Sequence, residues 1–159
     1  MTHARSPNVR VAIVAEPLDI TAEIERVSAG RGDIGAIVTF TGLCRDEDGR
    51  LEALELEHYP GMAETEVKRI AEQAAGRWEI SDVTVLHRHG KVRPGENIVL
   101  VVTASKHRHA AFESAEFIMD FLKTHAPFWK KEHTAAGAVA WVAAKQADDE
   151  AEERWNNSD

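Results

Sequence analysis

The sequence predicts an α+β fold, a single domain in which helices pack on one face of a mainly antiparallel sheet. Two observations lead to this prediction. Segments with strand-like alternation arrive in pairs between segments with helical spacing, which differs from the one-for-one alternation of a doubly wound parallel sheet. The chain has 159 residues, 43% of them hydrophobic, so it is long enough for one sizeable core and short for two.

The chain opens with a strand and a helix. Residues 9–15 are mostly apolar and β-branched, which is typical of a strand. Asp19 is a favourable N-cap residue, and apolar side chains then recur at helical spacing as far as Gly30. These segments form one β-α unit.

Two more strands and a second helix are expected next. Residues 34–42 are apolar and β-branched, and residues 51–59 alternate leucine with glutamate. We expect the charged segment 44–50 to join these strands as a hairpin-like loop. Pro60-Gly61 then begins a helix that extends to about Arg77. Its packed face is expected to carry Met62, Ile70 and Ala74.

The remaining strands flank a third helix. Residues 83–86 and 98–103 read as strands joined through 90–95, where Pro-Gly is a turn signal. Ser105 is expected to cap the third helix, which must end before Pro127. Residues 128–134 and 138–143 are then predicted to form a hairpin about Gly137.

The C-terminal segment differs in composition from the rest. Residues 147–159 contain six acidic residues and one arginine, which is typical of a solvated helix or a frayed end. We therefore expect a folded domain over residues 1–146 and an acidic tail over 147–159.

Composition excludes several classes of function. A net charge of −8 disfavours a phosphate backbone as ligand, and no Gly-rich phosphate loop is present. No apolar run approaches the roughly 18 residues that span a bilayer. The single cysteine, Cys44, excludes an internal disulfide and fits a reducing compartment. We expect a soluble, cytoplasmic protein that binds neither nucleic acid nor membrane.

Positive charge is concentrated in one segment of this acidic chain. Residues 105–133 carry a net charge of +1, so the remainder of the chain carries −9. At its start, His107 and Arg108 lie in the expected first turn of the third helix, where free backbone N–H groups and the helix dipole favour an anion. Arg108 can add a bidentate contact, so this turn is a candidate phosphate site.

Lys123 and Lys130 lie on either side of the proline at the end of this helix. Pro127 cannot continue the helix, so Lys123 falls in its last turn and Lys130 in the strand that follows. The two amines can then share one pocket. The simpler interpretation is that Lys123 complements the helix dipole and Lys130 decorates an exposed strand.

Two other kinds of site were considered. The pairs His87/His89 and His107/His109 each resemble half a metal site, but no further ligand is obviously placed to complete either one, and we expect no metal. Cys44 is a candidate sulfur nucleophile, because Arg45 beside it favours the thiolate, although a lone cysteine before a loop is more often a bystander.

Five segments in order along the chain resemble the catalytic (large) subunit of molybdopterin synthase. The most specific one is the run Phe-Ile-Met-Asp-Phe-Leu-Lys-Thr-His-Ala-Pro-Phe-Trp-Lys-Lys-Glu. The resemblance covers roughly residues 9–155. The segments are residues 36–45, 54–62, 93–96, 104–112 and 117–132.

The resemblance implies a hammerhead-like α/β fold and a sulfur transferase of molybdenum cofactor biosynthesis. Such an enzyme converts cyclic pyranopterin monophosphate into molybdopterin, whose dithiolene carries two sulfurs. The sulfur comes from the C-terminal Gly-Gly thiocarboxylate of a small ubiquitin-like carrier subunit. Two large subunits form a central homodimer within a heterotetramer, and the pocket draws residues from both. No cofactor, ATP or metal is needed.

The resemblance also implies roles for individual residues. Lys123 and Lys130 are the expected catalytic residues. The expected substrate-binding residues are Arg45, His107, Arg108, Phe40, Met119 and Lys145. The family commonly has an arginine after its Trp-Val pair, whereas this chain has Lys145 after Trp141-Val142, and lysine lacks the bidentate grip of arginine.

Two rival functions remain open from the sequence. A non-catalytic module could use the same basic pocket to bind a carboxylate tail or a phosphate. A sulfurtransferase acting through the Cys44 thiol would lose activity on substitution of that cysteine, whereas the carrier mechanism would not.

Overall fold

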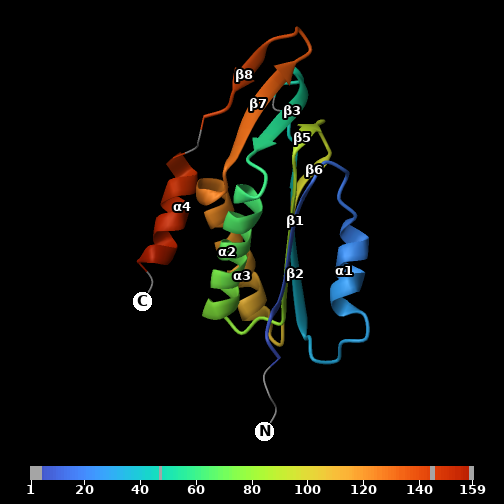
Figure 1. The fold of residues 1–159 in the computed structure, drawn as a ribbon, viewed down its shortest axis with the longest axis vertical. Helices are drawn as coiled ribbons and strands as arrows, with labels where there is room; N and C mark the ends of the chain where they lie inside the picture. Colours follow the sequence, from blue (N-terminus) through green and yellow to red (C-terminus); the bar gives the residue numbers. More distant parts are fainter. Residues whose placement is uncertain (1–4, 47, 144–145, 158–159) are drawn as a thin grey trace.

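In the part of the chain that the structure describes, the strands form two sheets that meet end to end (Figure 1). The structure is a computed structural model that describes residues 5–46, 48–143 and 146–157. In these residues sheet A has the strand order β1-β4-β6-β2 and sheet B the order β5-β3-β7-β8. The strands of sheet A are β1 (Asn8–Val14), β4 (Asp82–Arg88), β6 (Asn97–Ser105) and β2 (Ala36–Leu43). Those of sheet B are β5 (Gly90–Val92), β3 (Leu51–His58), β7 (Phe128–Thr134) and β8 (Val139–Trp141).

The predicted α+β class is confirmed, with one strand pair parallel and the others antiparallel. β1 pairs with β4 in parallel, while β4 with β6 and β6 with β2 are antiparallel. The pairs of sheet B are all antiparallel, including the predicted hairpin of β7 and β8. The hairpin expected around residues 44–50 is wrong, because β2 pairs in sheet A and β3 in sheet B.

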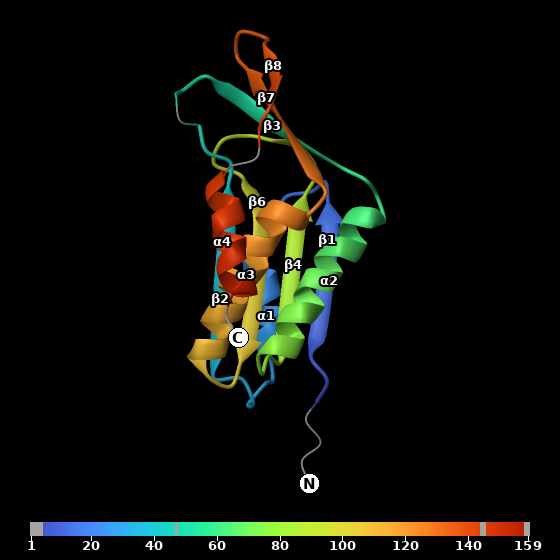
Figure 2. The same ribbon diagram turned by 90° about the vertical axis from the view of Figure 1, so that its left-hand side faces the viewer.

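Helices cover both faces of sheet A, where one face was expected. The helices α2 (Met62–Arg77) and α3 (Arg108–His125) pack on one face, and α1 (Ile20–Ser28) lies on the other (Figures 1 and 2). The reason is visible in β4, whose seven residues are all buried, so that both of its faces need a cover.

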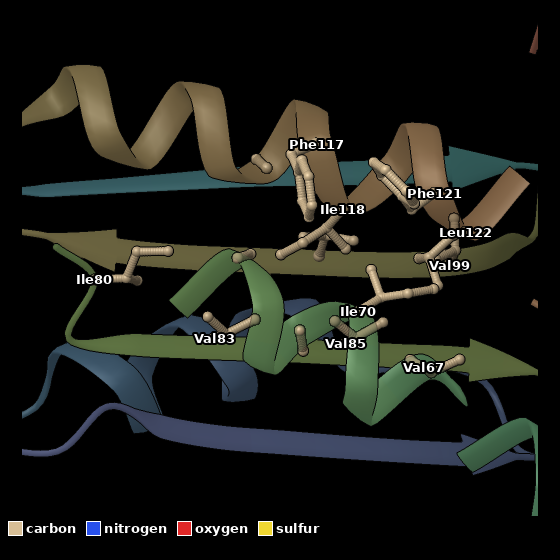
Figure 3. Packing of buried hydrophobic residues seen from close by; sticks show 14 of the residues in the cluster. Val67, Ile70, Ile80, Val83, Val85, Val99, Phe117, Ile118, Phe121 and Leu122 are labelled. Atoms are coloured by element: carbon tan, nitrogen blue, oxygen red, sulfur yellow. The ribbon is translucent and has the colours of Figure 1, made fainter. Parts of the chain in front are cut away.

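The larger core lies between sheet A and the helices α2 and α3 (Figure 3). Ile70 from α2 and Ile118 from α3 are fully buried over Val83 and Val85 of β4. Burial of side chains of this size stabilises the fold by roughly 1.5–3 kcal/mol each. The predicted face of α2 is correct for Ile70 and Ala74, but Met62 in its first turn is 61% exposed.

Helix α1 closes a second, smaller core on the opposite face. Asp19 is its N-cap, as predicted, and accepts a hydrogen bond from the backbone N–H of Ala22. Val27 packs with Leu86 and Leu100 of the sheet. This arrangement makes sheet A the middle layer of three.

Helix α3 begins later than expected and runs toward sheet B. Its N-cap is His107, because Ser105 still belongs to β6, and the Ser105 hydroxyl accepts a hydrogen bond from the His107 N–H at 3.0 Å. The helix ends at His125, and Pro127 leads directly into β7. The last turn of α3 therefore lies where the two sheets meet (Figure 2).

The acidic C-terminal segment forms helix α4 (Gln146–Asn156), which packs along α3. It is not solvated on every side, because Trp155 is buried in the larger core. The Trp155 indole N–H donates to Asp120 of α3 at 2.6 Å. None of the helices in the described part of the chain is long and apolar enough to cross a membrane.

Candidate active site

The predicted lysine pair lies at the corner between α3 and β7. Lys123 is exposed in the last turn of α3, and Lys130 is half-buried in β7. Residues two apart in a strand share a face, so Lys130 lies on the same face of β7 as Phe128. Phe128 in turn packs against the edge of the larger core, on the side covered by α3.

A buried histidine forms the floor of this corner. The ring of His87, at the end of β4, stacks on the ring of Phe128 with centroids 3.9 Å apart and planes inclined by 14°. Its Nδ1 lies 2.7 Å from the backbone oxygen of Arg88. His87 therefore connects the end of sheet A to the first residue of β7.

Both lysines affect the pKa of this histidine electrostatically. Burial, together with the positive charges of Lys130 and Lys123, lowers the pKa of His87 from an ordinary 6.5 to about 4. The two ammonium groups thus lie close enough to one buried ring to act on it together. Helix α3 and strand β7 therefore each place a lysine near the ring of His87.

Two other predicted residues lie at the same end of sheet A. Met119 precedes Lys123 by one helical turn and packs partly against the core. Arg45 is exposed just beyond β2, whose last residue, Leu43, pairs with Asn97 beside the position of His87. Phe40, from the middle of edge strand β2, is 41% exposed.

His107 and Arg108 lie at the opposite end of α3 from Lys123. Arg108 begins α3 and Lys123 is in its last turn, so they are separated along the axis by about 22 Å at about 1.5 Å per residue. His107 and Arg108 are both exposed, and the first turn of α3 contains no acidic residue. One copy of the chain does not bring the predicted phosphate site and the lysine pair together.

Cys44 is placed as a structural residue. It is 3% exposed and packs with Leu56 and Val92. Burial raises the pKa of its thiol, which opposes the thiolate that neighbouring Arg45 was expected to favour. Its backbone anchors the loop, because the Cys44 N–H donates to Glu96 and its carbonyl accepts from Gly95.

Sequence reasoning missed His87 as a site residue. The pair His87/His89 was considered only as half a metal site. Among the residues that the structure describes, no group of three or more His, Cys, Asp or Glu side chains is arranged to hold a metal ion. The ring of His87 faces Phe128 instead, a contact between two sheets that spacing along the chain does not reveal.

Comparison with known proteins identifies the family. The sequence model of the MoaE protein family matches residues 13–125. The chain belongs to the MoaE family. It is 60% identical over 146 residues to the molybdopterin synthase catalytic subunit of Brucella melitensis, covering 91% of this chain and 90% of that one.

Solved structures of the MoaE family share the fold. The MoaE protein of Burkholderia ambifaria superposes with a TM-score of 0.79 at 44% identity, covering 96% of this chain and 99% of that one. Molybdopterin synthase from Staphylococcus aureus gives a TM-score of 0.74 at 30% identity, covering 89% and 99%. The chain is thus a MoaE-family catalytic subunit of molybdopterin synthase, an enzyme of molybdenum cofactor biosynthesis.

The last of the predicted MoaE site residues, Lys145, lies outside the described residues. Val142, three residues before it, donates its N–H to the backbone oxygen of Lys130 at 2.9 Å. The chain therefore runs beside β7 as far as Val142.

Proposed function

We propose that this protein transfers sulfur from the C-terminal thiocarboxylate of a small ubiquitin-like carrier subunit to cyclic pyranopterin monophosphate, with Lys123 and Lys130 as the catalytic residues. The observation that carries this proposal is the pair of lysines beside one buried, neutral histidine. Lysine side chains are cations at neutral pH unless their surroundings change that. Two of them at one corner attract a thiocarboxylate and stabilise negative charge that develops as sulfur adds to a pterin carbon.

The sulfur is brought by the carrier in this proposal. The one cysteine of the chain is buried with a raised thiol pKa, so it is a poor nucleophile. Each carrier molecule delivers one sulfur: its thiocarboxylate sulfur bonds to a pterin carbon in place of an oxygen substituent, which gives a thioester. Water then attacks the acyl carbon, the acyl C–S bond breaks, the sulfur stays on the pterin and the carrier leaves as a carboxylate. A dithiolene has two sulfurs, so two carriers must visit while a monosulfurated intermediate stays bound. The relatives are named as catalytic subunits, which supports an enzyme that also contains a second kind of subunit.

The complete site is proposed to need two copies of this chain. His107 and Arg108 would hold the substrate phosphate, but they lie a helix length away from Lys123 in the same copy. A second copy can supply them across a homodimer interface. The edge strand β2 and the exposed rings of Phe40 and Phe112 offer apolar surface for such an interface. Phe40, Met119 and Arg45 would then complete the pocket walls, and Lys145 is a further candidate for binding the substrate.

The test is turnover by the purified protein with cyclic pyranopterin monophosphate and a thiocarboxylated carrier, following the oxidised fluorescent derivative of the product. Lys123→Ala should lower the rate by about 100-fold or more, as loss of a charge-stabilising group does, while still binding the carrier. Lys68→Ala removes an exposed lysine of α2 and serves as the matched control. Carrier binding without product in the wild type, or full activity in Lys123→Ala, would contradict the proposal.

A further inference from the structure

Four rings form a ladder beneath the lysine pair. His87 stacks on Phe128 at 3.9 Å, Phe128 stacks on His58 at 6.0 Å, and His58 contacts His89 at 4.7 Å between centroids. The ladder crosses from β4 of sheet A to β7 and β3 of sheet B. It therefore connects the two sheets at the corner that carries Lys123 and Lys130.

The orientation of the His87 ring follows from its hydrogen bond. A backbone carbonyl only accepts, so Nδ1 of His87, at 2.7 Å from the Arg88 oxygen, must carry the hydrogen. In the neutral ring Nε2 then has the lone pair. The backbone of Arg88 is itself well anchored, because its buried guanidinium donates to Glu96 at 2.9 Å and to the Ala15 oxygen at 3.1 Å.

Burial and the charges around His87 keep its ring neutral. Lys130 from β7, Lys123 from α3 and His58 from β3 each lower its pKa, in addition to the larger effect of burial. The Arg88 carbonyl acts in the opposite direction, and the balance leaves the pKa at about 4. The ring is therefore uncharged wherever the enzyme is folded at neutral or mildly acidic pH.

We propose that His87 is a positioning residue for sulfur transfer, whose neutral ring holds Phe128, and through it Lys130, without placing a third positive charge beside the lysine pair. Phe128 is the first residue of β7, so fixing its ring between His87 and His58 fixes where the strand starts. Strand alternation then aims Lys130 at the same corner. The functional part of this inference rests on the proposed roles of the lysines.

The electrostatic part can be tested without any substrate. In the protein with isotopically labelled histidine, NMR titration should show the His87 ring neutral, with hydrogen on Nδ1, from pH 8 down to pH 5, its signals being assigned with His87→Phe. Lys130→Ala and Lys123→Ala should each raise the pKa of His87, and Lys68→Ala, on the outer side of α2, should leave it unchanged. A His87 ring that titrates at its ordinary value, or that ignores both lysine substitutions, would overturn the inference.

The positioning part is tested by the kinetics of two matched variants. His87→Phe keeps a ring to stack on Phe128, so it should retain kcat within about threefold, whereas His87→Ala should lose about tenfold or more, in kcat more than in KM. Phe128→Leu removes the other half of the stack, and it should reproduce the kcat loss if His87→Ala does not fold. Equal losses in His87→Phe and His87→Ala, or no loss in Phe128→Leu, would show that the stack does not position Lys130. Absence of turnover in the wild type would count against the proposed function, and the titration result would still stand.

Discussion

Cys44 and Lys123, the two candidate catalytic residues from different mechanisms, differ in burial. Cys44 and Lys123 are both polar or reactive residues that the sequence places next to loops or helix ends. The thiol is buried against Leu56 and Val92, while the ammonium group reaches solvent. A residue that packs in a core contributes to stability, and one that reaches a corner open to substrate can contribute to chemistry.

Substitution of Cys44 should therefore affect stability and leave the chemistry intact. Cys44→Ala removes a buried sulfur and should lower the free energy of unfolding by about 1–2 kcal/mol. The rate per folded molecule should stay within about twofold of wild type, since the proposed source of the sulfur is the carrier. Urea unfolding and the turnover assay measure the two effects separately, and an inactive but folded variant would restore the cysteine mechanism.

The residues around the corner differ in how far the sequence could reveal them. Lys123 and Lys130 were predictable because Pro127 ends a helix by local chemistry, which fixes both residues relative to the corner. His87 was not, because its partner Phe128 is distant in the chain and belongs to the other sheet. The contact forms only when the two sheets pack together, so residue spacing within one segment does not predict it.

At the scale of elements, helix α4 is anchored on α3 by one large buried side chain, Trp155, and also by ion pairs of Arg154 with Glu116 and of Glu152 with His125. The Trp155 ring meets the rings of Trp78 and Phe117 at 5.6 Å each, and the guanidinium of Arg77 lies 5.5 Å from its centroid. Its N–H donates to Asp120. The acidic composition of this segment did not reveal the attachment. Burial of one large aromatic side chain is enough to hold the helix on the domain while its charged side chains stay in solvent.

Removing that side chain should release α4 from the domain. Trp155→Ala should lower the free energy of unfolding by roughly 3 kcal/mol, the usual cost of emptying a large buried aromatic site. Hydrogen exchange should speed up first in α4 and in the facing half of α3. Trp155→Phe keeps a ring but loses the bond to Asp120, so its loss should be smaller; equal exchange rates in wild type and Trp155→Ala would contradict this account.

Most elements were predictable, and the exceptions share a cause. The segments that became β1, α1, α2, β4, β6, β7 and β8 follow local spacing and turn signals closely. The position of α1 on the second face, the separation of β2 from β3 and the short strand β5 within the expected connection 90–95 were not predicted. All three depend on which strands become neighbours, and that choice is made by the whole core, not by any one segment.

At the scale of the whole molecule, His87 should make the protein sensitive to acid. The unfolded chain binds a proton on this ring at an ordinary pKa of 6.5, while the folded chain does so only near 4. Between these values the unfolded state holds more protons, so this contribution is complete above pH 6.5 and is lost as the pH falls toward 4. The loss over the interval is about 3 kcal/mol.

Urea unfolding at pH 7 and pH 4.5 measures this effect. Wild type should lose more stability between these pH values than His87→Phe, by about 2–3 kcal/mol, because the variant has no ring to protonate. Carboxylates elsewhere contribute equally to both proteins and cancel in the comparison. Parallel losses in the two proteins would show that His87 does not stay neutral in the fold.

The length of α3 has a consequence for the assembly. It holds the lysine pair at one end and His107 with Arg108 at the other, so a site that uses both must draw them from two copies. In a symmetric dimer each copy then contributes lysines to one site and Arg108 to the other. A variant that lacks Lys123 and a variant that lacks Arg108 would each be inactive alone, yet able to complement one another.

The most direct test mixes these two variants. Lys123→Ala and Arg108→Ala chains, denatured together and refolded with thiocarboxylated carrier and cyclic pyranopterin monophosphate, should recover about a quarter of the wild-type activity, because half of the dimers are mixed and each holds one intact site. Each variant refolded alone should stay inactive. Recovery would establish a shared site that needs both the lysine corner and the helix start. Failure to recover, with mixed dimers shown to form, would mean that the two groups do not act in one site.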